Sequence, residues 1–472
     1  RGAMRERESD KREDRKIVIV GAGFAGIEAA HEFGRAGIPF TLIDQRNYHL
    51  FQPLLYHVAT SILQDADIAA PARSLVSRFE GAEVLMDKVL DIDVPTRNLV
   101  TEAGIVPYDH LILATGAQTS YFGNDHFAEH AFPLKTLSDA TSLRHQILTA
   151  FERAEMAEDE ETRRKLITFA IVGGGPNGVG VAVAIKELAA KTLARDFVHI
   201  HAESARVVIV EALDQILGGI DPELVDKGVE ILKRKGVEIR TGAMVEEVDE
   251  EGVVIGGERL EAGTVVWTAG VEVPRLAEWL GAEANKKGQV QVEPDLRVPG
   301  HPEIFVTGDA ALSLDDEGKP HPGLAANAKQ QGRFAARAII AMRRGEKPTE
   351  RYVYNDYGTM VPLGRFSAIA EIKGRKLTGF IAWAIWAVVH IFYLMDLRRR
   401  ILVSLNWFSA YVTQRRGSRI ILSGEDVELP EATRTASRRK RVAQTQRTKP
   451  EDATDVKETT QVKHEVAKRG KA

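Results

Sequence analysis

Two passages of the sequence, about 150 residues apart, share one order of features: a strand rich in β-branched residues, a glycine-rich turn, a helix pattern and a second strand that ends in an acidic residue. The first passage has its turn at residues 21–26 and its acid at Asp44, and the second has its turn at 173–178 and its acid at Glu211. Strands that alternate with helices favour parallel pairing, because a parallel pair needs a crossover connection. The duplication therefore predicts an α/β chain with two similar units.

The glycines of both turns follow the spacing of a dinucleotide site. They are Gly21, Gly23 and Gly26 in the first turn and Gly173, Gly175 and Gly178 in the second. In such a site the first glycine makes a tight turn, the second lets the backbone approach a pyrophosphate, and the third lets the helix pack on the strand. One turn of this kind is weak evidence, but two in the same context make ordinary strand-to-helix turns a poor alternative. We expect two Rossmann-like dinucleotide-binding domains.

The acid at the end of each second strand is expected to accept hydrogen bonds from ribose hydroxyls. A 2′-phosphate would be repelled there, so the pair of acids favours FAD and NAD over NADP. Asp44 follows the first glycine by 23 residues, whereas Glu211 follows Gly173 by 38. An insertion at residues 189–204 is therefore expected to lengthen the second crossover.

Composition excludes several classes of protein. The 472 residues include no cysteine, which excludes disulfides, thiolate-bound zinc, iron–sulfur clusters held by cysteine and a cysteine nucleophile. Redox chemistry in this chain would need an organic cofactor. The net charge of −4 argues against a nucleic-acid partner recruited by bulk positive charge. We predict no metal site, because no group of His, Asp and Glu residues has the sequence spacing that is typical of metal ligands.

Three later stretches complete a pattern that resembles the flavoprotein superfamily with two dinucleotide-binding domains. Residues 111–116 and 265–270 are apolar strands that end in small-residue turns, and 304–310 is an apolar strand closed by Gly308 and Asp309. The resemblance implies FAD in the first unit and the pyridine nucleotide in the second. It also implies that Asp309 hydrogen-bonds the ribityl chain of the flavin.

The stretch NYHLFQPLLY at residues 47–56 looks like the type II NADH dehydrogenase family, the single-chain NADH:quinone oxidoreductases that pump no protons. Similar matches recur at 266–270, at 358–365, in the segment with Trp383, Trp386 and His390, and at 415–417. The resemblance covers about residues 15–422. The absence of cysteine separates this chain from the disulfide reductases and sulfide:quinone reductases of the same superfamily.

The motifs and the resemblance together assign residues to each cofactor. The FAD set is Gly21, Gly23, Phe24, Ala25, Gly26, Asp44, Gln45, Val89, Ala114, Thr115, Gly116, Gly308, Asp309 and Ala325. The NADH set is Gly173, Gly175, Pro176, Asn177, Gly178, Glu211, Ala269 and Gly270. No catalytic side chain is expected, because a flavin carries the chemistry itself. The helix after residues 322–324 is expected to point its N-terminus at the reduced flavin and stabilise its negative charge.

Two positions depart from the family pattern. Gly180 stands where the family usually has Glu, and Ala326 stands where it usually has Gln. The candidate residues for the quinone pocket are Gly180, Ala326, Asn327, Gln330 and Gln331. The departures leave a second hypothesis open, namely a membrane-docked sensor that binds FAD and NADH, or a reductase with an acceptor other than quinone.

The C-terminal part carries two apolar stretches, 379–395 and 401–412. The first has 17 residues, fewer than the roughly 20 that a spanning helix needs. Trp383, Trp386, His390 and Tyr393 share one helical face, which suits the level of lipid headgroups. We expect two helices lying in one leaflet, anchored by Arg415, Arg416 and Arg419. A helix buried in a dimer and a true membrane span are the alternatives.

The sequence also predicts the organisation and location of the chain. Residues 1–15 read as a tag remnant and disordered N-terminus without a secretory signal, and 423–472 as a disordered basic tail whose cluster 438–441 is either solvated or in contact with lipid. The expected domains are an FAD domain at 16–140 and 288–345, an NADH domain at 141–287 and a membrane-anchoring region at 346–422. The expected protein is a homodimer, peripheral on the cytoplasmic face of a plasma membrane or cell inner membrane.

Overall fold

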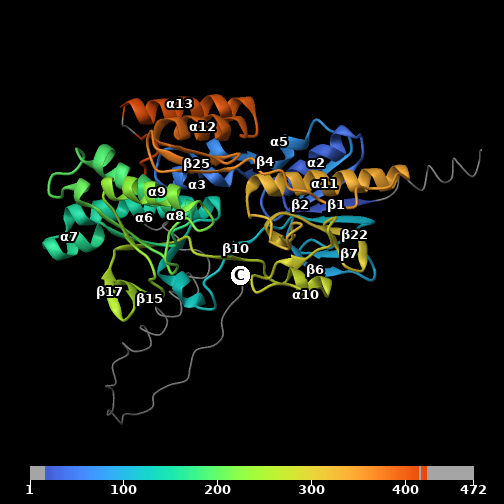
Figure 1. Cartoon of the computed structure of the whole chain (residues 1–472), viewed down its shortest axis with the longest axis horizontal. Helices are drawn as coiled ribbons and strands as arrows, with labels where there is room; N and C mark the ends of the chain where they lie inside the picture. Colours follow the sequence, from blue (N-terminus) through green and yellow to red (C-terminus); the bar gives the residue numbers. More distant parts are fainter. Residues whose placement is uncertain (1–15, 414–415, 422–472) are drawn as a thin grey trace, which may run out of the picture.

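The computed structural model describes residues 16–413 and 416–421, and shows two sheets of similar topology side by side, with two helices above one of them (Figure 1). The basic cluster 438–441 and Arg415 lie outside the described residues. The first sheet has the strand order β21-β22-β9-β1-β2-β5. Its strands are β1 (Ile17–Val20), β2 (Phe40–Asp44), β5 (Ala82–Met86), β9 (His110–Leu113), β21 (Arg297–Val298) and β22 (His301–Val306).

The second sheet repeats this arrangement, with the strand order β11-β18-β12-β13-β14. Its strands, all parallel, are β11 (Ala131–Pro133), β12 (Thr168–Val172), β13 (Arg206–Val210), β14 (Val237–Arg240) and β18 (Thr264–Trp267). In both sheets the first strand of the unit pairs on one side with the next strand along the chain and on the other with a later one. The predicted α/β fold with two Rossmann-like sheets is confirmed.

The central strands form because their residues suit a sheet that is buried on both faces. All residues of β1 (IVIV) and β12 (TFAIV) are buried, as expected for parallel strands between two layers of helices. Helix α2 (Phe24–Arg35) follows β1, and α8 (Pro176–Glu187) follows β12. A π-helical turn (Leu188–Leu193) and a 3₁₀ turn (Ala202–Ser204) then extend the second crossover. The insertion predicted at 189–204 is therefore confirmed.

Shorter elements join and cover the two sheets. A ribbon of β10 (Gln118–Thr119) and β19 (Val271–Glu272) ties together the segments that leave β9 and β18. Each unit carries a three-stranded antiparallel sheet, β6 (Val89–Asp93), β7 (Asn98–Thr101) and β8 (Ile105–Pro107) in the first, and β15 (Val245–Asp249), β16 (Gly252–Ile255) and β17 (Glu258–Glu261) in the second. The helices of these parts are α3 (Leu55–Ala59), α4 (Asp65–Ile68), α5 (Ala72–Val76), α6 (Leu137–Met156), α7 (Glu160–Leu166), α9 (Pro222–Arg234) and α10 (Leu276–Leu280).

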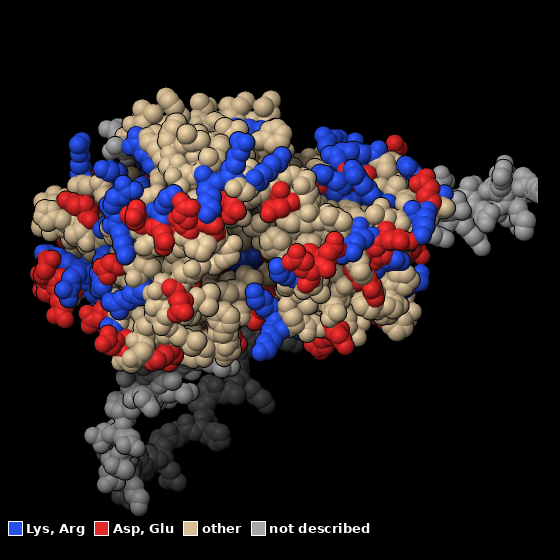
Figure 2. Space-filling model, in the orientation of Figure 1, with Lys and Arg blue, Asp and Glu red and all other residues tan. Residues whose placement is uncertain are grey.

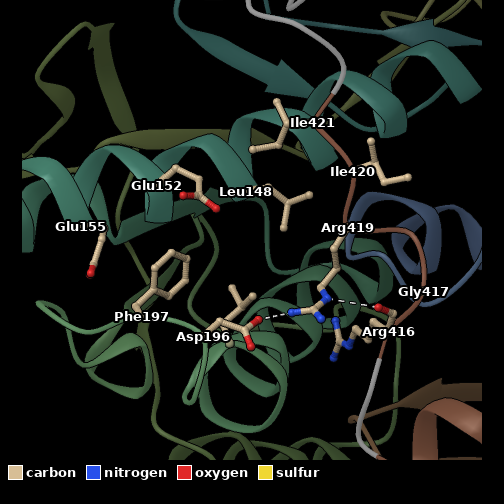
Figure 3. Close-up of a pocket in the computed structure, with 11 residues that line it drawn as sticks. Leu148, Glu152, Glu155, Asp196, Phe197, Arg416, Gly417, Arg419, Ile420 and Ile421 are labelled. Carbon is tan, nitrogen blue, oxygen red and sulfur yellow. Dashed lines mark hydrogen bonds and ion pairs between the residues drawn. The ribbon is translucent and has the colours of Figure 1, made fainter.

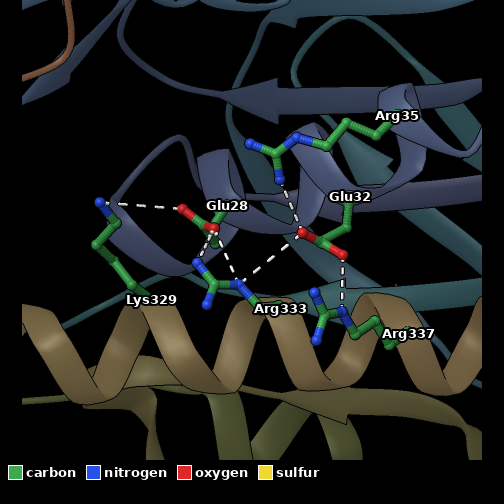
Figure 4. A network of polar contacts seen from close by, with 6 residues as sticks. All are labelled: Glu28, Glu32, Arg35, Lys329, Arg333 and Arg337. Atoms are coloured by element: carbon green, nitrogen blue, oxygen red, sulfur yellow. Dashed lines mark hydrogen bonds and ion pairs between the residues drawn. The ribbon is translucent and has the colours of Figure 1, made fainter.

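Helix α11 (Ala325–Arg344) lies along α2 at very short range. A Cβ at Gly332 would stand 2.0 Å from the carbonyl oxygen of Ala25, so only glycine allows this approach. An ion network joins the two helices, with Glu28 and Glu32 of α2 facing Arg333 of α11 (Figure 4). Burial alone would raise the pKa of Glu28, but the hydrogen bond from Arg333 and nearby cations lower it instead.

The C-terminal part combines a small sheet with two helices. The sheet consists of β24 (Thr359–Pro362), β25 (Ala368–Ile372) and β26 (Arg375–Thr378), and the helices are α12 (Gly379–Phe392) and α13 (Leu397–Thr413). Buried residues of both helices, such as Trp386 and Trp407, belong to the same hydrophobic core as α3, α8 and the second sheet. Among the described residues, no helix combines the length and apolarity needed to cross a bilayer.

Candidate functional site

The first glycine of each turn adopts the same unusual backbone conformation. Gly21 and Gly173 both have a φ of 103°, in the region that favours glycine. A Cβ at Gly21 would lie 2.2 Å from the carbonyl oxygen of Ala114, and one at Gly173 would lie 2.7 Å from the amide nitrogen of Ala269. Each turn is therefore closed against the end of the neighbouring strand, β9 in the first unit and β18 in the second.

The other two glycines divide their roles in the same way in both turns. A Cβ at Gly26 or Gly178 would stand 1.8 or 1.9 Å from the carbonyl oxygen of the first glycine of its turn, so helix and turn touch there. A Cβ at Gly23 or Gly175 meets no protein atom within 4 Å. These two glycines are the N-caps of α2 and α8, and neither helix has a side-chain cap. Each turn thus offers free N–H groups on an open side, which suits a pyrophosphate.

Each of the two acids accepts a hydrogen bond from the backbone of its own glycine turn. Asp44 accepts a hydrogen bond of 2.6 Å from the N–H of Ala22, and Glu211 accepts one of 2.7 Å from the N–H of Gly174. The other oxygen of each carboxylate accepts a bond from a backbone N–H two residues further along. Burial raises the pKa of Asp44. The sequence indicated a ribose-binding role for these acids and missed this anchoring role, which depends on the folded turn.

Asp309 lies where the two units meet. Its carboxylate is 3.3 Å from the ammonium of Lys135, a residue of the connector after β11 in the second sheet. A Cβ at Gly323, just before α11, would be 3.6 Å from the same carboxylate. The N-terminus of α11 therefore adjoins Asp309, and its N-cap, Leu324, provides no side-chain cap. Sequence reasoning missed Lys135, because a single lysine in a connector carries no motif.

Most of the remaining residues of the two cofactor sets lie at the start of a helix or just after a strand. Phe24 and Ala25 begin α2, with Ala325 at the start of α11; Ala114, Thr115 and Gly116 follow β9, and Gly308 precedes Asp309. Pro176 and Asn177 are exposed in the first turn of α8, while Ala269 and Gly270 follow β18. Gln45 is exposed after β2, and Val89 begins β6, where it pairs with Thr101. The assignment of these residues to FAD and NADH stays a prediction.

The three amides proposed for a quinone pocket have partners within the protein. Asn327 donates to the carbonyl oxygen of Pro322 at 2.9 Å and accepts from the hydroxyl of Tyr352. Gln330 pairs with the backbone of Asn355, and Gln331 accepts from the N–H of Gly308 at 2.7 Å. The bonds of Asn327 and Gln331 tie α11 to the segment before it, at Pro322 and Gly308, and those of Gln330 tie it to the segment that follows. Ala326 lies half-buried beside them in the first turn. Their part in quinone binding stays a prediction.

Gly180 lies against an aromatic ring. A Cβ at this position would be 3.3 Å from the ring of Tyr56 in α3, so the ring occupies the space beside the glycine. Any side chain at position 180 would have to shift that ring. The glycine that replaces the family's Glu at this position therefore leaves room for Tyr56, where α3 packs on α8. One sequence alone does not reveal this contact.

The stretch at 47–56, together with the adjacent His57, meets the C-terminal helices in an aromatic cluster. The indole N–H of Trp407 donates to Nδ1 of His57 at 3.1 Å, and Trp386 stacks on Trp407 with ring centroids 5.2 Å apart. His390 packs against Phe51. Two segments that the sequence singled out separately, some 330 residues apart, therefore form one cluster.

This cluster corrects the predicted orientation of α12. The face with Trp386 and His390 packs on the protein, whereas we expected it at the level of lipid headgroups; only Tyr393, at its end, is substantially exposed. The two helices expose large apolar side chains, which include Phe380, Ile381, Val388, Phe392, Leu397, Ile401, Leu405, Phe408 and Val412. We call this set the apolar face. The stacking of Trp386 on Trp407 explains the difference, because it buries more apolar surface than a headgroup position would.

The expected role of the arginines after α13 also needs correction. The guanidinium of Arg416 is buried and donates to the carbonyl oxygens of Thr60 and Ala184, and burial lowers its pKa to about 10. Arg419 pairs with Asp196. Both residues therefore hold the C-terminal segment against the protein. A pocket of about 400 Å³ lies beside this segment, between it and Leu148, Glu152 and Phe197 (Figure 3), and none of its lining residues belongs to the glycine turns.

The buried histidines predict a loss of stability in mild acid. Burial lowers the pKa of His49 and His390 to about 4, and lowers that of His57 well below its usual value of 6.5. Below pH 6.5 the unfolded chain takes up protons that the folded chain refuses, so each histidine costs up to about 1.4 kcal/mol of stability per pH unit. We expect the melting temperature to fall between pH 6.5 and pH 4.5. The loss should be smaller in His390→Leu, and an equal loss in that variant would contradict the prediction.

Comparison with known proteins agrees with this geometry. Residues 15–332 match the pyridine nucleotide-disulphide oxidoreductase family. Two proteins of Mycobacterium tuberculosis, the type II NADH:quinone oxidoreductases Ndh and NdhA, are 42% and 40% identical to the chain over 417 and 425 residues. These alignments cover 85% and 86% of the chain and 89% of each relative.

Solved structures show the same fold at lower identity. The NDH2 of Plasmodium falciparum, solved in complex with NADH, is 19% identical with a TM-score of 0.79 over 87% of this chain and 100% of that one. The sulfide:quinone oxidoreductase of Aquifex aeolicus is 16% identical with a TM-score of 0.64 over 82% of this chain and 92% of that one. The chain, with its two glycine turns and no cysteine, belongs to the pyridine nucleotide-disulphide oxidoreductase family and within it to the type II NADH:quinone oxidoreductases.

Proposed function

We propose that this chain oxidises NADH at FAD held by the first glycine turn and reduces a quinone taken from the membrane surface. The observation that carries the proposal is the pair of turns, each with free N–H groups and open space at its second glycine, Gly23 or Gly175. FAD bound there would supply the chemistry, as a carrier of a hydride and of two electrons. The chain supplies binding, orientation and charge.

The residues around the first turn suit FAD. The N-terminus of α2 can hold the pyrophosphate. Each carboxylate oxygen of Asp44 keeps a free lone pair besides its backbone bond, so it can also accept a hydrogen bond from a ribose hydroxyl. The paired Asp309 and Lys135 offer an acceptor and a donor for the polyol chain. Helix α11 is 20 residues long, and the positive end of its dipole, at the N-terminus, lies beside this pair. That partial charge would stabilise an anionic reduced flavin.

The second turn suits NADH for the same reasons. Glu211 supports the adenosine side at the end of β13, and Ala269 with Gly270 borders the nicotinamide side at the end of β18. A carboxylate at the ribose favours NADH over NADPH. The proposal divides the chain into an FAD domain at 16–140 and 288–345, an NADH domain at 141–287 and a C-terminal region at 346–422.

The apolar face supports a position on the membrane surface. In Figure 2 the projection formed by α12 and α13 at the top is almost free of acidic side chains, and Lys and Arg side chains lie below it. Apolar side chains can enter the acyl region of one leaflet while cations contact anionic headgroups. Exposed cations in and next to the helices include Arg398 of α13 and, before α12, Lys373 and Arg375. We therefore propose a peripheral enzyme on the cytoplasmic face of a plasma or cell inner membrane. The homodimer expected from the sequence stays a prediction.

Absorption spectroscopy tests the proposed function. The purified protein should show a flavin spectrum that NADH bleaches and that a membrane quinone, added with lipid vesicles, restores. A colourless protein that does not take up added FAD would refute the cofactor assignment. Bleaching without recovery on addition of quinone would refute the acceptor.

A further inference from the structure

One exposed phenylalanine, Phe122, lies at the mouth of the second dinucleotide site in a strained conformation. Its φ is 54°, a value in the left-handed region that is unfavourable for a residue other than glycine. Its side chain is also 66% exposed, so burial does not offset that cost. No part of the fold described so far accounts for the position of this ring.

The ring is placed against Gly270. A Cβ at Gly270 would lie 2.3 Å from the tip of the Phe122 ring, so the ring occupies the space that a side chain would need. Gly270 itself has a φ of 79° and is exposed. The two residues form a pair in which glycine makes room for the aromatic ring.

The loop that carries Phe122 is fastened to the end of β18. The N–H of Phe122 donates to the hydroxyl of Ser120 at 3.2 Å, and that hydroxyl donates to Glu272 at 2.8 Å. The indole N–H of Trp267, the last residue of β18, donates to the carbonyl oxygen of Ser120 at 2.9 Å. These bonds hold the strained residue in a defined place, as is common at ligand sites.

The strand order identifies which half of the dinucleotide reaches this place. A dinucleotide crosses the sheet edge where the strand order reverses, here at the glycine turn after β12. Glu211 at the end of β13 marks the adenosine side, so the end of β18, on the other side of β12, borders the nicotinamide. An aromatic ring can stack on or against a planar nicotinamide and exclude water from it.

We infer that Phe122 is a positioning residue for NADH, whose ring forms one wall of the nicotinamide subsite. The inference rests on the proposed function, because it requires NADH at the second turn. It assigns a role in the reaction to a residue of the connector between the two sheets. The ring would fix the orientation of the nicotinamide, which speeds hydride transfer without a chemical step at Phe122 itself.

A pair of ligands tests this inference on the purified holoenzyme. NAD⁺ contains nicotinamide and ADP-ribose does not, while both share adenosine and the pyrophosphate. In Phe122→Ala we expect NAD⁺ binding to weaken about tenfold and ADP-ribose binding to change less than about twofold, as measured by calorimetry. Phe122→Tyr, which keeps the ring, should restore NAD⁺ affinity.

Two further variants separate binding from folding. Phe122→Asn tolerates the left-handed backbone and lacks the ring, so it should keep or raise the melting temperature and still lose NAD⁺ affinity. Phe366, also exposed and with a φ of 57°, lies on Trp383 instead, so Phe366→Ala is the matched control and should leave both affinities unchanged.

Equal weakening of both ligands in Phe122→Ala, or no weakening of NAD⁺, would overturn the inference alone. Binding of neither ligand by the unchanged protein would overturn the NADH site of the proposed function as well. The two failures are therefore distinguishable.

Discussion

Replacement of Gly175 by alanine should abolish most NADH binding while the protein stays folded and keeps its FAD. The reason is that a Cβ at Gly175 meets no protein atom within 4 Å, so the methyl group strains nothing in the protein itself. It would occupy the space into which a pyrophosphate must come to reach the N–H groups of α8. We expect the dissociation constant for NAD⁺, which uses the same site, to rise about ten- to a hundredfold, which corresponds to about 1.4–2.8 kcal/mol. Titration of the oxidised protein with NAD⁺ measures this change.

The first turn provides the matched control. A Cβ at Gly23 also meets no protein atom, so Gly23→Ala should fold and should lose FAD affinity instead. In contrast, Gly26→Ala would place its methyl 1.8 Å from the carbonyl oxygen of Gly21 and should disrupt the turn itself. If Gly175→Ala and Gly23→Ala lowered FAD content equally, or if Gly175→Ala bound NAD⁺ normally, the assignment of one dinucleotide to each turn would be wrong.

Charges on the apolar face should release the protein from lipid. Phe392 and Phe408 are 64% and 67% exposed, from α12 and α13 respectively. Moving one phenylalanine from water to an apolar environment gains about 1.5–3 kcal/mol, so loss of both reduces membrane partitioning about a hundred- to ten-thousandfold. We expect the double variant Phe392→Glu/Phe408→Glu to stay in the supernatant when anionic vesicles are sedimented. Its flavin should still be bleached by NADH.

The control for this experiment is Met156→Glu. Met156 ends α6 and is 75% exposed, so the variant adds a Glu at an apolar surface residue outside the apolar face, with one added negative charge where the double variant adds two. It should sediment with vesicles as the unchanged protein does. Co-sedimentation of the double variant would contradict the proposed membrane contact, and release of Met156→Glu would show that net charge alone controls binding.

The glycine turns illustrate what a linear pattern can predict. Gly21 and Gly173 were recognisable because the backbone conformation that they adopt excludes most other residues, so a local requirement is visible as a residue type. The same holds for the buried β-branched strands, whose side chains suit a sheet covered on both faces. Both features depend on neighbours that are close along the chain.

The helices α12 and α13 illustrate the limit of such patterns. The spacing of Trp383, Trp386 and His390 correctly indicated one helical face, but periodicity does not tell which surroundings that face meets. The partners of Trp386 and His390 are His57, Phe51 and Trp407, brought there by folding. The side that we expected to meet lipid headgroups therefore mostly meets protein, and the opposite side is exposed.

Taken by itself, the sequence determined the two Rossmann-like sheets, the turn in each that suits a dinucleotide and the exclusion of thiol chemistry, because each follows from residues adjacent in the chain or from composition. Only the tertiary structure decided that Lys135 meets Asp309, that Tyr56 packs on Gly180 and that Phe122 lies on Gly270. Each of these pairs joins residues from distant segments, and their contact depends on how the two units pack rather than on any local preference. The residues expected to act on the nicotinamide, the flavin and the quinone are defined by that packing.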